Sequence, residues 1–337
     1  MNETDCCTVD VVRGSVVESR HRVHAAVVDA EGQLRAFAGD PELVTFIRSA
    51  AKPFQALAMV EDGAADRFGL TDREVALVCG SHAGAPVHTS TAESILAKLG
   101  LDAEALACGP HPPFDPITRR ELQEAGLEPV RLHNNCSGKH AGMLALARAR
   151  GWETQEYQHP DHPVQWRMLT EVARWARLPA EAIALGSDGC GVVCFGLPLR
   201  NMALAFAGLA RAARQGEPGP ARIVAAMTGH PEMVAGKGRL CTELMRRTEG
   251  RVFAKVGAEG VYCVGVTGAE LGVAVKVEDG STRAVAPAIL GVLRELDLIS
   301  EDDFGAMHAQ VYPDVVNTRG EITGQLRPSV RLRAPDA

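Results

Sequence analysis

The chain has 337 residues and a formal net charge of −7, from 35 Lys and Arg against 42 Asp and Glu. With 46% apolar and 23% charged residues, its composition excludes a collagen-like or intrinsically disordered chain. The negative charge disfavours nucleic acid and anionic membranes as partners, because both call for a basic face. No apolar stretch reaches the roughly 18 residues of a membrane span. Residues 1–10 lack the basic and apolar regions of a secretion signal, so we expect a cytoplasmic protein.

The N-terminal third mixes predicted strands and helices. Short β-branched runs at 11–17 and 23–28, a turn at 29–32 and an apolar run at 34–37 predict strands. Apolar residues three and four apart then predict a helix from residue 49 to about 63, with Pro53 in its first turn. We expect a further strand at 74–78, followed by a tight turn at 79–84. A helix is expected at 87–99 and a Pro-rich irregular loop at 108–116.

The rest of the chain is predicted to be mainly helical before it returns to strands. A polar turn at 133–142 leads into an expected helix at 143–150. Further helices are expected at 164–178, 202–214, 220–227 and 286–298. Two short strands flank a turn at 186–191, and others are expected at 252–256, 261–265 and 271–277, before an irregular C-terminus.

This order of elements predicts an α/β fold. Strands gathered toward both chain ends favour one mixed or antiparallel sheet flanked by helices, with a helical lobe from the middle of the chain. We find no internal repeat and no clear linker. Residues 1–337 are therefore expected to form a single integrated catalytic unit, with an α/β lobe from both ends and a helical lobe.

Lysine is rare in this chain. Only six of the 35 basic residues are Lys, at positions 52, 98, 139, 237, 255 and 276. An amine can lose its proton near neutral pH when burial and cationic neighbours depress its pKa, whereas a guanidinium cannot. Retained lysines therefore indicate positions where an amine that can deprotonate is needed.

Three lysine or serine segments suggest nucleophilic chemistry. Ser49 and Lys52, three apart at a helix start, share a face, so the amine could take the hydroxyl proton. Ser81 lies in a turn that could present a second hydroxyl, although this segment taken alone favours an ordinary strand-to-helix turn with a serine cap. Lys255 lies on a predicted strand. Penicillin-binding enzymes also have a lysine that follows their Ser-x-x-Lys helix along the chain, so the order of the two segments is the same. Because Val256 replaces their hydroxyl residue, a β-lactamase or peptidase is disfavoured.

Two cysteines in separate turns could hold a metal. The nine cysteines are an odd number and favour reduced thiols or a metal site over a disulfide framework. Cys136 and Cys190 together could bind zinc as thiolates. Lys139 stands where a conventional ligand is usual, and His140 is the more conventional candidate. The alternative is two buried free cysteines.

Several long segments together resemble one family. They are RSAAKPFQAL, CGSHAGAPVHT, CGPHPP, NNCSGKHAGML, GSDGCGVVCFGLPL and KVGAEGVY, spread over roughly residues 10–325. With them the chain resembles the asparaginase II family, the thermolabile, rhizobial-type L-asparaginases. The resemblance implies a fold like that of serine-dependent glutaminases and class A β-lactamases. It also implies a homodimer that hydrolyses L-asparagine to L-aspartate and ammonia.

The resemblance also implies roles for individual residues. Ser49 would be the nucleophile and Lys52 its general base, with Ser81 and Lys255 completing the catalytic set. Substrate would contact three residues: Arg48, Asp188 and His140. One zinc ion per chain, positioning substrate or supporting the structure, would be held by Cys136, Lys139 and Cys190.

Two other functions remain open from the sequence. A glutaminase would share the chemistry and need a longer pocket. A non-enzymatic zinc-dependent binding protein would need Cys136 and Cys190 but not Ser49.

Overall fold

The computed structural model describes residues 7–335, so residues 1–6 of the segment examined for a secretion signal lie outside it. The chain divides into two compact units. The sheet unit comprises Met1–Ala50, Leu197–Arg211 and Val256–Ala337, and the helical unit comprises Ala51–Gly196 and Ala212–Lys255. A single integrated catalytic unit stays a prediction.

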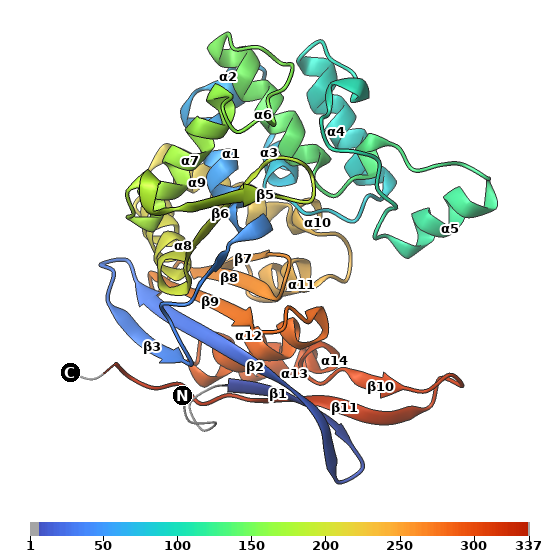
Figure 1. Cartoon of the computed structure of the whole chain (residues 1–337), viewed down its shortest axis with the longest axis vertical. Helices are drawn as coiled ribbons and strands as arrows, with labels where there is room; N and C mark the ends of the chain where they lie inside the picture. The colour runs from blue at the N-terminus through green and yellow to red at the C-terminus, as the bar shows by residue number, and fades with distance from the viewer. Residues whose placement is uncertain (1–6, 336–337) are drawn as a thin grey trace. The chain divides into compact units, whose positions relative to one another are not determined.

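The sheet unit is built on an antiparallel sheet, seen in Figure 1. Its strands run in the order β10-β11-β1-β2-β9-β8, and β3 also pairs with β2. Their bounds are β1 (Cys7–Arg13), β2 (Val16–Asp29), β3 (Leu34–Ala38), β8 (Val261–Val266), β9 (Leu271–Val277), β10 (Asp314–Val316) and β11 (Ile322–Ser329). The unit also holds β4 (Val44–Phe46), and β7 (Val252–Val256) ends at the unit boundary.

The two chain ends meet in this sheet. Val11 of β1 lies opposite Leu326 of β11, and Val27 of β2 lies opposite Val273 of β9. The prediction of an α/β fold with a sheet assembled from both termini is therefore confirmed. The expectation of an irregular C-terminus is wrong, because β11 pairs along β1. Only Leu326 of β11 is buried, so this strand carries no alternating apolar pattern that would reveal it.

The first hairpin turns earlier than the apolar pattern suggests. The predicted strand at 11–17 is interrupted by a turn at Gly14, whose φ of 57° is in the left-handed region that glycine adopts readily. β1 and β2 pair on either side of this turn. The turn expected at 29–32 does connect β2 and β3, which pair antiparallel.

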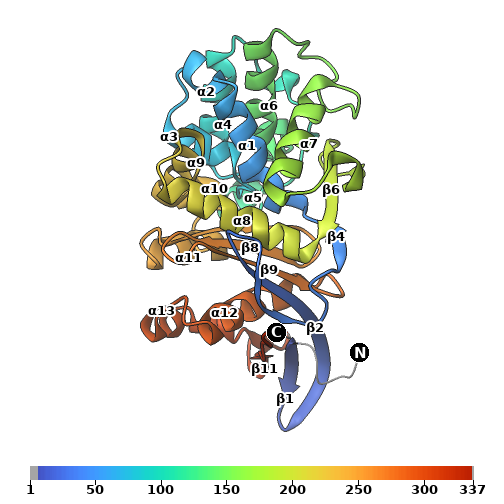
Figure 2. The same cartoon turned by 90° about the vertical axis from the view of Figure 1, so that its left-hand side faces the viewer.

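Helices cover both faces of the sheet, as Figure 2 shows for α8 and α12. α8 (Leu199–Arg214) belongs to the sheet unit up to Arg211, and α12 (Val285–Glu295) lies on the other face. Gly272 of β9 lies so close to α8 that a Cβ there would collide with the Ala203 carbonyl oxygen. Two short helices, α13 (Glu301–Ala306) and α14 (His308–Val311), precede β10.

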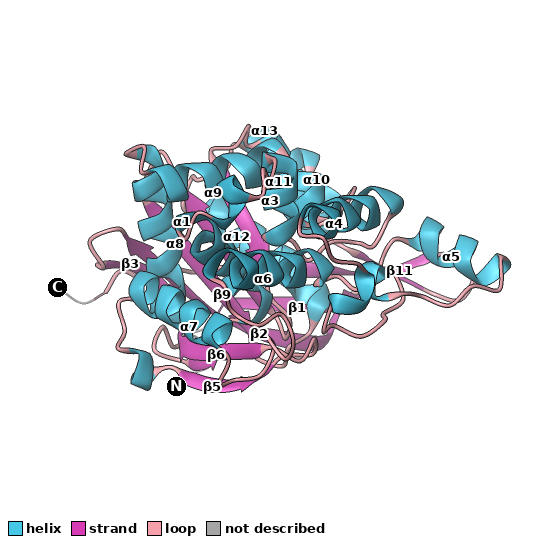
Figure 3. Cartoon of the chain, turned by 90° about the horizontal axis from the view of Figure 1, so that it is seen from above, coloured by secondary structure: helices cyan, strands magenta, loops and turns pink. Residues whose placement is uncertain are grey.

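The helical unit gathers around α6, as Figure 3 shows. α6 (Ser137–Arg150) contacts α1 (Lys52–Glu61), α3 (Asp72–Val78), α4 (Pro86–Lys98) and α7 (Pro163–Ala176). The other helices are α2 (Ala64–Arg67), α5 (Pro116–Glu124), α9 (Pro218–Gly229), α10 (Pro231–Val234) and α11 (Leu240–Arg247), and β5 (Ala184–Ser187) pairs with β6 (Val193–Pro198). Within residues 7–335, every helix is too short or too polar to traverse a lipid bilayer.

The segment predicted as a strand at 74–78 is a helix, α3. The Thr71 hydroxyl accepts a hydrogen bond from the Glu74 amide at 3.3 Å, and the Glu74 carboxylate accepts one from the Thr71 amide at 2.7 Å. This reciprocal pair is a capping box, which satisfies free N–H groups at a helix start. The sequence T-D-R-E carried that signal, and the short apolar run obscured it.

α6 begins at Ser137, six residues earlier than predicted. The glycines of the expected turn are instead contact points between helices. A Cβ on Gly138 would lie 2.5 Å from the Leu77 carbonyl oxygen, and one on Gly142 would collide with the Val78 side chain. Glycine therefore allows α6 to approach α3 closely, which a prediction from turn propensity misses.

We expect Gly272→Ala to destabilise the protein. The added methyl group would meet the backbone of α8, which cannot move aside as a flexible side chain can. Overpacking of this kind lowers the free energy of unfolding by about 1–3 kcal/mol, measurable by urea unfolding. Gly268→Ala is the matched control, because its Cβ would have nothing within 4 Å. Equal unfolding midpoints for the two variants would contradict the close contact.

Candidate active site

The Ser81 hydroxyl lies between two buried lysine amines. Lys52 Nζ and Lys255 Nζ are each 2.9 Å from Ser81 Oγ. Both lysines are 0% exposed and Ser81 is 5% exposed. The structure thus brings together three residues that the sequence placed on three separate segments.

Local structure fixes each of these side chains. Lys52 is the first residue of α1, and Pro53 follows it in the first turn, as expected, where a missing N–H costs no helical hydrogen bond. The Ser81 amide donates to the Val234 carbonyl at 2.8 Å, which holds the turn after α3 against α10. A Cβ on Gly80 would lie 2.5 Å from the Met233 carbonyl oxygen, so only glycine fits there.

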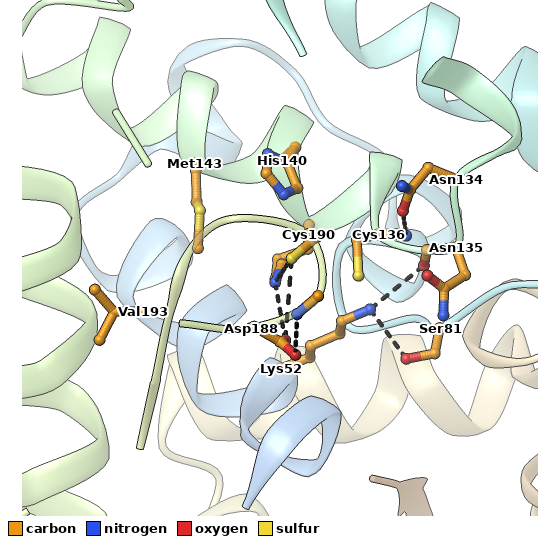
Figure 4. A network of polar contacts seen from close by, with 12 residues as sticks. Lys52, Ser81, Asn134, Asn135, Cys136, His140, Met143, Asp188, Cys190 and Val193 are labelled. Atoms are coloured by element: carbon orange, nitrogen blue, oxygen red, sulfur yellow. Dashed lines mark hydrogen bonds and ion pairs between the residues drawn. The ribbon is translucent and has the colours of Figure 1, made fainter. Parts of the chain in front are cut away.

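The two amines have different surroundings. Lys52 Nζ donates to the carbonyl oxygens of Gly80 at 2.6 Å and Asn135 at 3.3 Å, besides contacting Ser81 (Figure 4). It therefore has three acceptors, the number of N–H bonds of an ammonium group. Burial, followed by the charge of Lys52, lowers the pKa of Lys255 to about 7. A neutral Lys255 amine can accept the Ser81 hydroxyl proton while Ser81 accepts from Lys52.

A second cluster lies beside the first. Cys136 is the N-cap of α6, and Lys139 is in its first turn. Lys139 Nζ is 2.9 Å from the sulfur of Cys190, which lies in the turn between β5 and β6. Asp188 of the same turn places its carboxylate 3.9 Å from Lys139 Nζ and 4.0 Å from the Cys190 sulfur. The Asn135 carbonyl that accepts from Lys52 immediately precedes Cys136, which joins the two clusters.

The pKa values of the two thiols are shifted in opposite directions. A hydrogen bond from Cys190 holds the pKa of Cys136 well below its usual range, and the lysine charges act in the same direction. The same hydrogen bond, together with burial, raises the pKa of Cys190. Burial opposes the charge of Lys139, but the charges of Cys136 and Cys190 outweigh it and raise the pKa of that amine.

The donor chemistry of this cluster fits zinc. Two thiol sulfurs and one amine nitrogen converge, and thiolates are ligands that zinc prefers. Lys139 would have to lose its proton to contribute a lone pair. No group of three or more His, Cys, Asp or Glu side chains within residues 7–335 is placed to hold a metal ion, so any site here depends on this lysine.

His140 lies on the same helix beside these ligands, shown in Figure 4. Its Nδ1 is 2.7 Å from the Tyr157 hydroxyl oxygen, which accepts a hydrogen bond from the Ala107 amide at 2.8 Å. Burial, followed by the charges of Lys139 and Lys52, lowers the pKa of His140 well below its usual range, so the ring is neutral. Sequence analysis missed Tyr157, because a single tyrosine in an irregular segment carries no pattern.

His82 is another buried histidine that sequence analysis did not single out. Its Nδ1 accepts from the Gly84 amide at 3.2 Å, so Nε2 donates to the Ser137 hydroxyl at 2.9 Å. Burial lowers the pKa of His82 well below its usual range, and the ring stacks on His88 at 5.1 Å. The hydrogen bond between His82 and Ser137 holds the turn that carries Ser81 against the start of α6.

Ser49 and Arg48 belong to the sheet unit. They lie in a 3-10 turn, Arg48–Ala51, that runs without a break into α1. Arg48 has a φ of 52°, in the left-handed region, which costs a non-glycine residue about 1 kcal/mol or more. Such strain persists where the surrounding structure imposes it, which is common next to functional residues.

Comparison with known proteins identifies the family. The chain matches the family described as L-asparaginase II over residues 9–328. Among curated proteins none matches. Similar solved structures include a beta-lactamase (Mb2281c) from Mycobacterium bovis, at 17% identity, 86% and 94% coverage of the two chains and a TM-score of 0.42. Another is Mglu in its L-glutamate binding form, at 17%, with 82% and 61% coverage and a TM-score of 0.38. The match over nearly the whole length shows that the chain belongs to the L-asparaginase II family.

Proposed function

We propose that the protein hydrolyses the side-chain amide of L-asparagine, giving L-aspartate and ammonia, with Ser49 as nucleophile. Family membership supports an amidohydrolase that acts on a small molecule. The observation that carries the proposal is the Ser81 hydroxyl shared between the buried amines of Lys52 and Lys255. Such an arrangement can move a proton, which a purely structural hydroxyl does not require.

In this mechanism Lys255 accepts the proton that Lys52 gives up. Two ammonium groups beside one hydroxyl repel each other, so a single proton is shared across the pair. Lys52 passes its proton through Ser81 to Lys255 and becomes a neutral base. Ser49 is three residues before Lys52 in the sequence, a spacing that favours one face of a helix and supports this pairing. Lys52 then takes the Ser49 proton.

The remaining steps follow from the chemistry of a serine nucleophile. The Ser49 oxygen attacks the amide carbon, and Lys52 returns the proton that it took from Ser49 to the amide nitrogen. The C–N bond then breaks and ammonia leaves, and water hydrolyses the resulting ester to release L-aspartate and free Ser49. The substrate carries an α-carboxylate and an α-ammonium group. The guanidinium of Arg48 suits the carboxylate and the carboxylate of Asp188 suits the ammonium.

We also propose that Cys136, Lys139 and Cys190 hold one zinc ion per chain. The converging sulfur and nitrogen donors support this assignment. When bound, zinc would supply a fixed positive charge that orients an oxygen of the substrate. The homodimer and the cytoplasmic location remain predictions, and the first is tested by light scattering in solution.

Ser49→Ala should abolish ammonia release from L-asparagine. Loss of a nucleophile lowers kcat by about 10⁴-fold or more. Ser90→Ala is the matched control, because Ser90 is exposed on α4 and its hydroxyl only contacts the Val87 carbonyl. Comparable rates for Ser49→Ala and wild type would refute the assignment of the nucleophile. The ratio of kcat/KM on Asn and Gln separates an asparaginase from a glutaminase.

The pH profile should report Lys255. Its pKa is lowered to about 7, so the neutral amine is present above pH 7 and is lost as the pH falls through that value. The value of kcat/KM should therefore rise between about pH 6 and 8 and then level off. Lys255→Met and Lys255→Arg, which cannot accept the proton, should lose the rise together with most activity. The exposed Lys237→Met should keep it.

Removal of either thiol should remove the metal. We expect wild-type protein dialysed against zinc to retain about one ion per chain, as measured by elemental analysis. Cys136→Ser and Cys190→Ser should retain much less, whereas Cys263→Ser in β8 of the sheet unit should match wild type. Wild-type protein that holds no zinc would rule out the site.

A further inference from the structure

His140 has one ring nitrogen that is satisfied and one that is not. Nδ1 is paired with the Tyr157 hydroxyl at 2.7 Å. Nε2 is buried and has no hydrogen-bond partner within residues 7–335. The whole residue is 0% exposed. A buried ring nitrogen without a hydrogen-bond partner lowers the stability of the folded state, and a ligand that pairs with it would remove that cost.

The Tyr157 hydroxyl decides where the His140 proton lies. Its oxygen already accepts a hydrogen bond from the Ala107 amide at 2.8 Å. The only acceptor that the described residues offer its own O–H is His140 Nδ1. Burial raises the pKa of Tyr157, so this donor proton stays on the phenol.

The opposite tautomer satisfies fewer groups. A proton on Nδ1 would be donated to the Tyr157 oxygen, and the Tyr157 O–H would then have no acceptor. The neutral ring therefore keeps its proton on Nε2. A protonated Nε2 has no lone pair for a metal and can only donate a hydrogen bond.

We propose that Tyr157 is a positioning residue that fixes His140 as an Nε2–H donor, and that this N–H binds a carboxylate or carbonyl oxygen of the ligand. The identity of the ligand as a small amino acid rests on the proposed function. His140 lies one turn of α6 after Cys136 and three residues before Met143, so all three share a face. A neutral donor adds a directed hydrogen bond beside Lys139 and Lys52 without adding a further positive charge.

The tautomer can be measured directly by NMR. In protein with ¹⁵N-labelled histidine, long-range ¹⁵N–¹H correlations distinguish a protonated ring nitrogen from an unprotonated one. His140→Gln assigns the His140 signals among the 11 histidines by their disappearance. We expect a proton on Nε2 in wild type. A proton on Nδ1 would overturn the role of Tyr157.

The role of Tyr157 is tested by removing its hydroxyl. Tyr157→Phe should let both tautomers of His140 appear, because neither ring nitrogen then has a fixed partner. Tyr262→Phe, a second buried tyrosine in β8 of the sheet unit, should leave the wild-type tautomer unchanged. An unchanged tautomer in Tyr157→Phe would also overturn the assignment.

The proposed contact between the His140 Nε2–H and a ligand oxygen is tested by adding L-aspartate to the labelled wild-type protein. A change in the His140 Nε2–H signal that saturates with aspartate supports an oxygen contact, and no change at saturation of the protein overturns it. Tyr157→Phe should raise KM for asparagine about tenfold while kcat changes less. These spectra do not require turnover. If they behave as expected and no ammonia is released, the proposed function fails and this inference stands.

Discussion

The site depends on one constraint: two buried lysine amines contact the same hydroxyl oxygen. Like charges at such a distance, away from water, cannot both be fully ionised. Lys52 Nζ donates to the Gly80 and Asn135 carbonyls, and Lys255 is the amine whose pKa falls to about 7. The neutral lysine is therefore Lys255, on β7. In the proposed mechanism, Lys52 becomes a base by passing its proton through Ser81 to Lys255.

The helical unit is built to hold this arrangement. Close contact of α6 with α3, made possible by Gly138 and Gly142, brings the start of α6 next to the turn that carries Ser81. Asn135 and Cys136 lie at that start, so one packing interaction positions an acceptor for Lys52 and the first thiol of the second cluster. The hydrogen bond between His82 and Ser137 joins the same two segments.

Much of the fold and the site could be predicted from sequence, and the failures have physical causes. Local apolar patterns predict the strands at 252–256 and 271–277 and the helix at 87–99. Proline position supports the helix that contains Pro53 in its first turn. The strand assigned to 74–78 was wrong, because a short apolar run occurs in buried helices as well as in strands. The turn assigned to 133–142 was wrong, because glycines that allow two helices to approach closely resemble turn glycines in the sequence. The scarcity of lysine indicated Lys52, Lys139 and Lys255. Tyr157 could not be found, because its role arises only from the contact with His140.

The protonation of Lys255 is the central claim, and its direct measurement is a pH titration by NMR. With only six lysines, ¹³C labelling of the lysine Cε positions gives a spectrum simple enough to assign, and Lys255→Met identifies the signal. The account predicts that this signal titrates near pH 7. If it titrates near the ordinary lysine value of about 10.4, the shared-proton mechanism is contradicted.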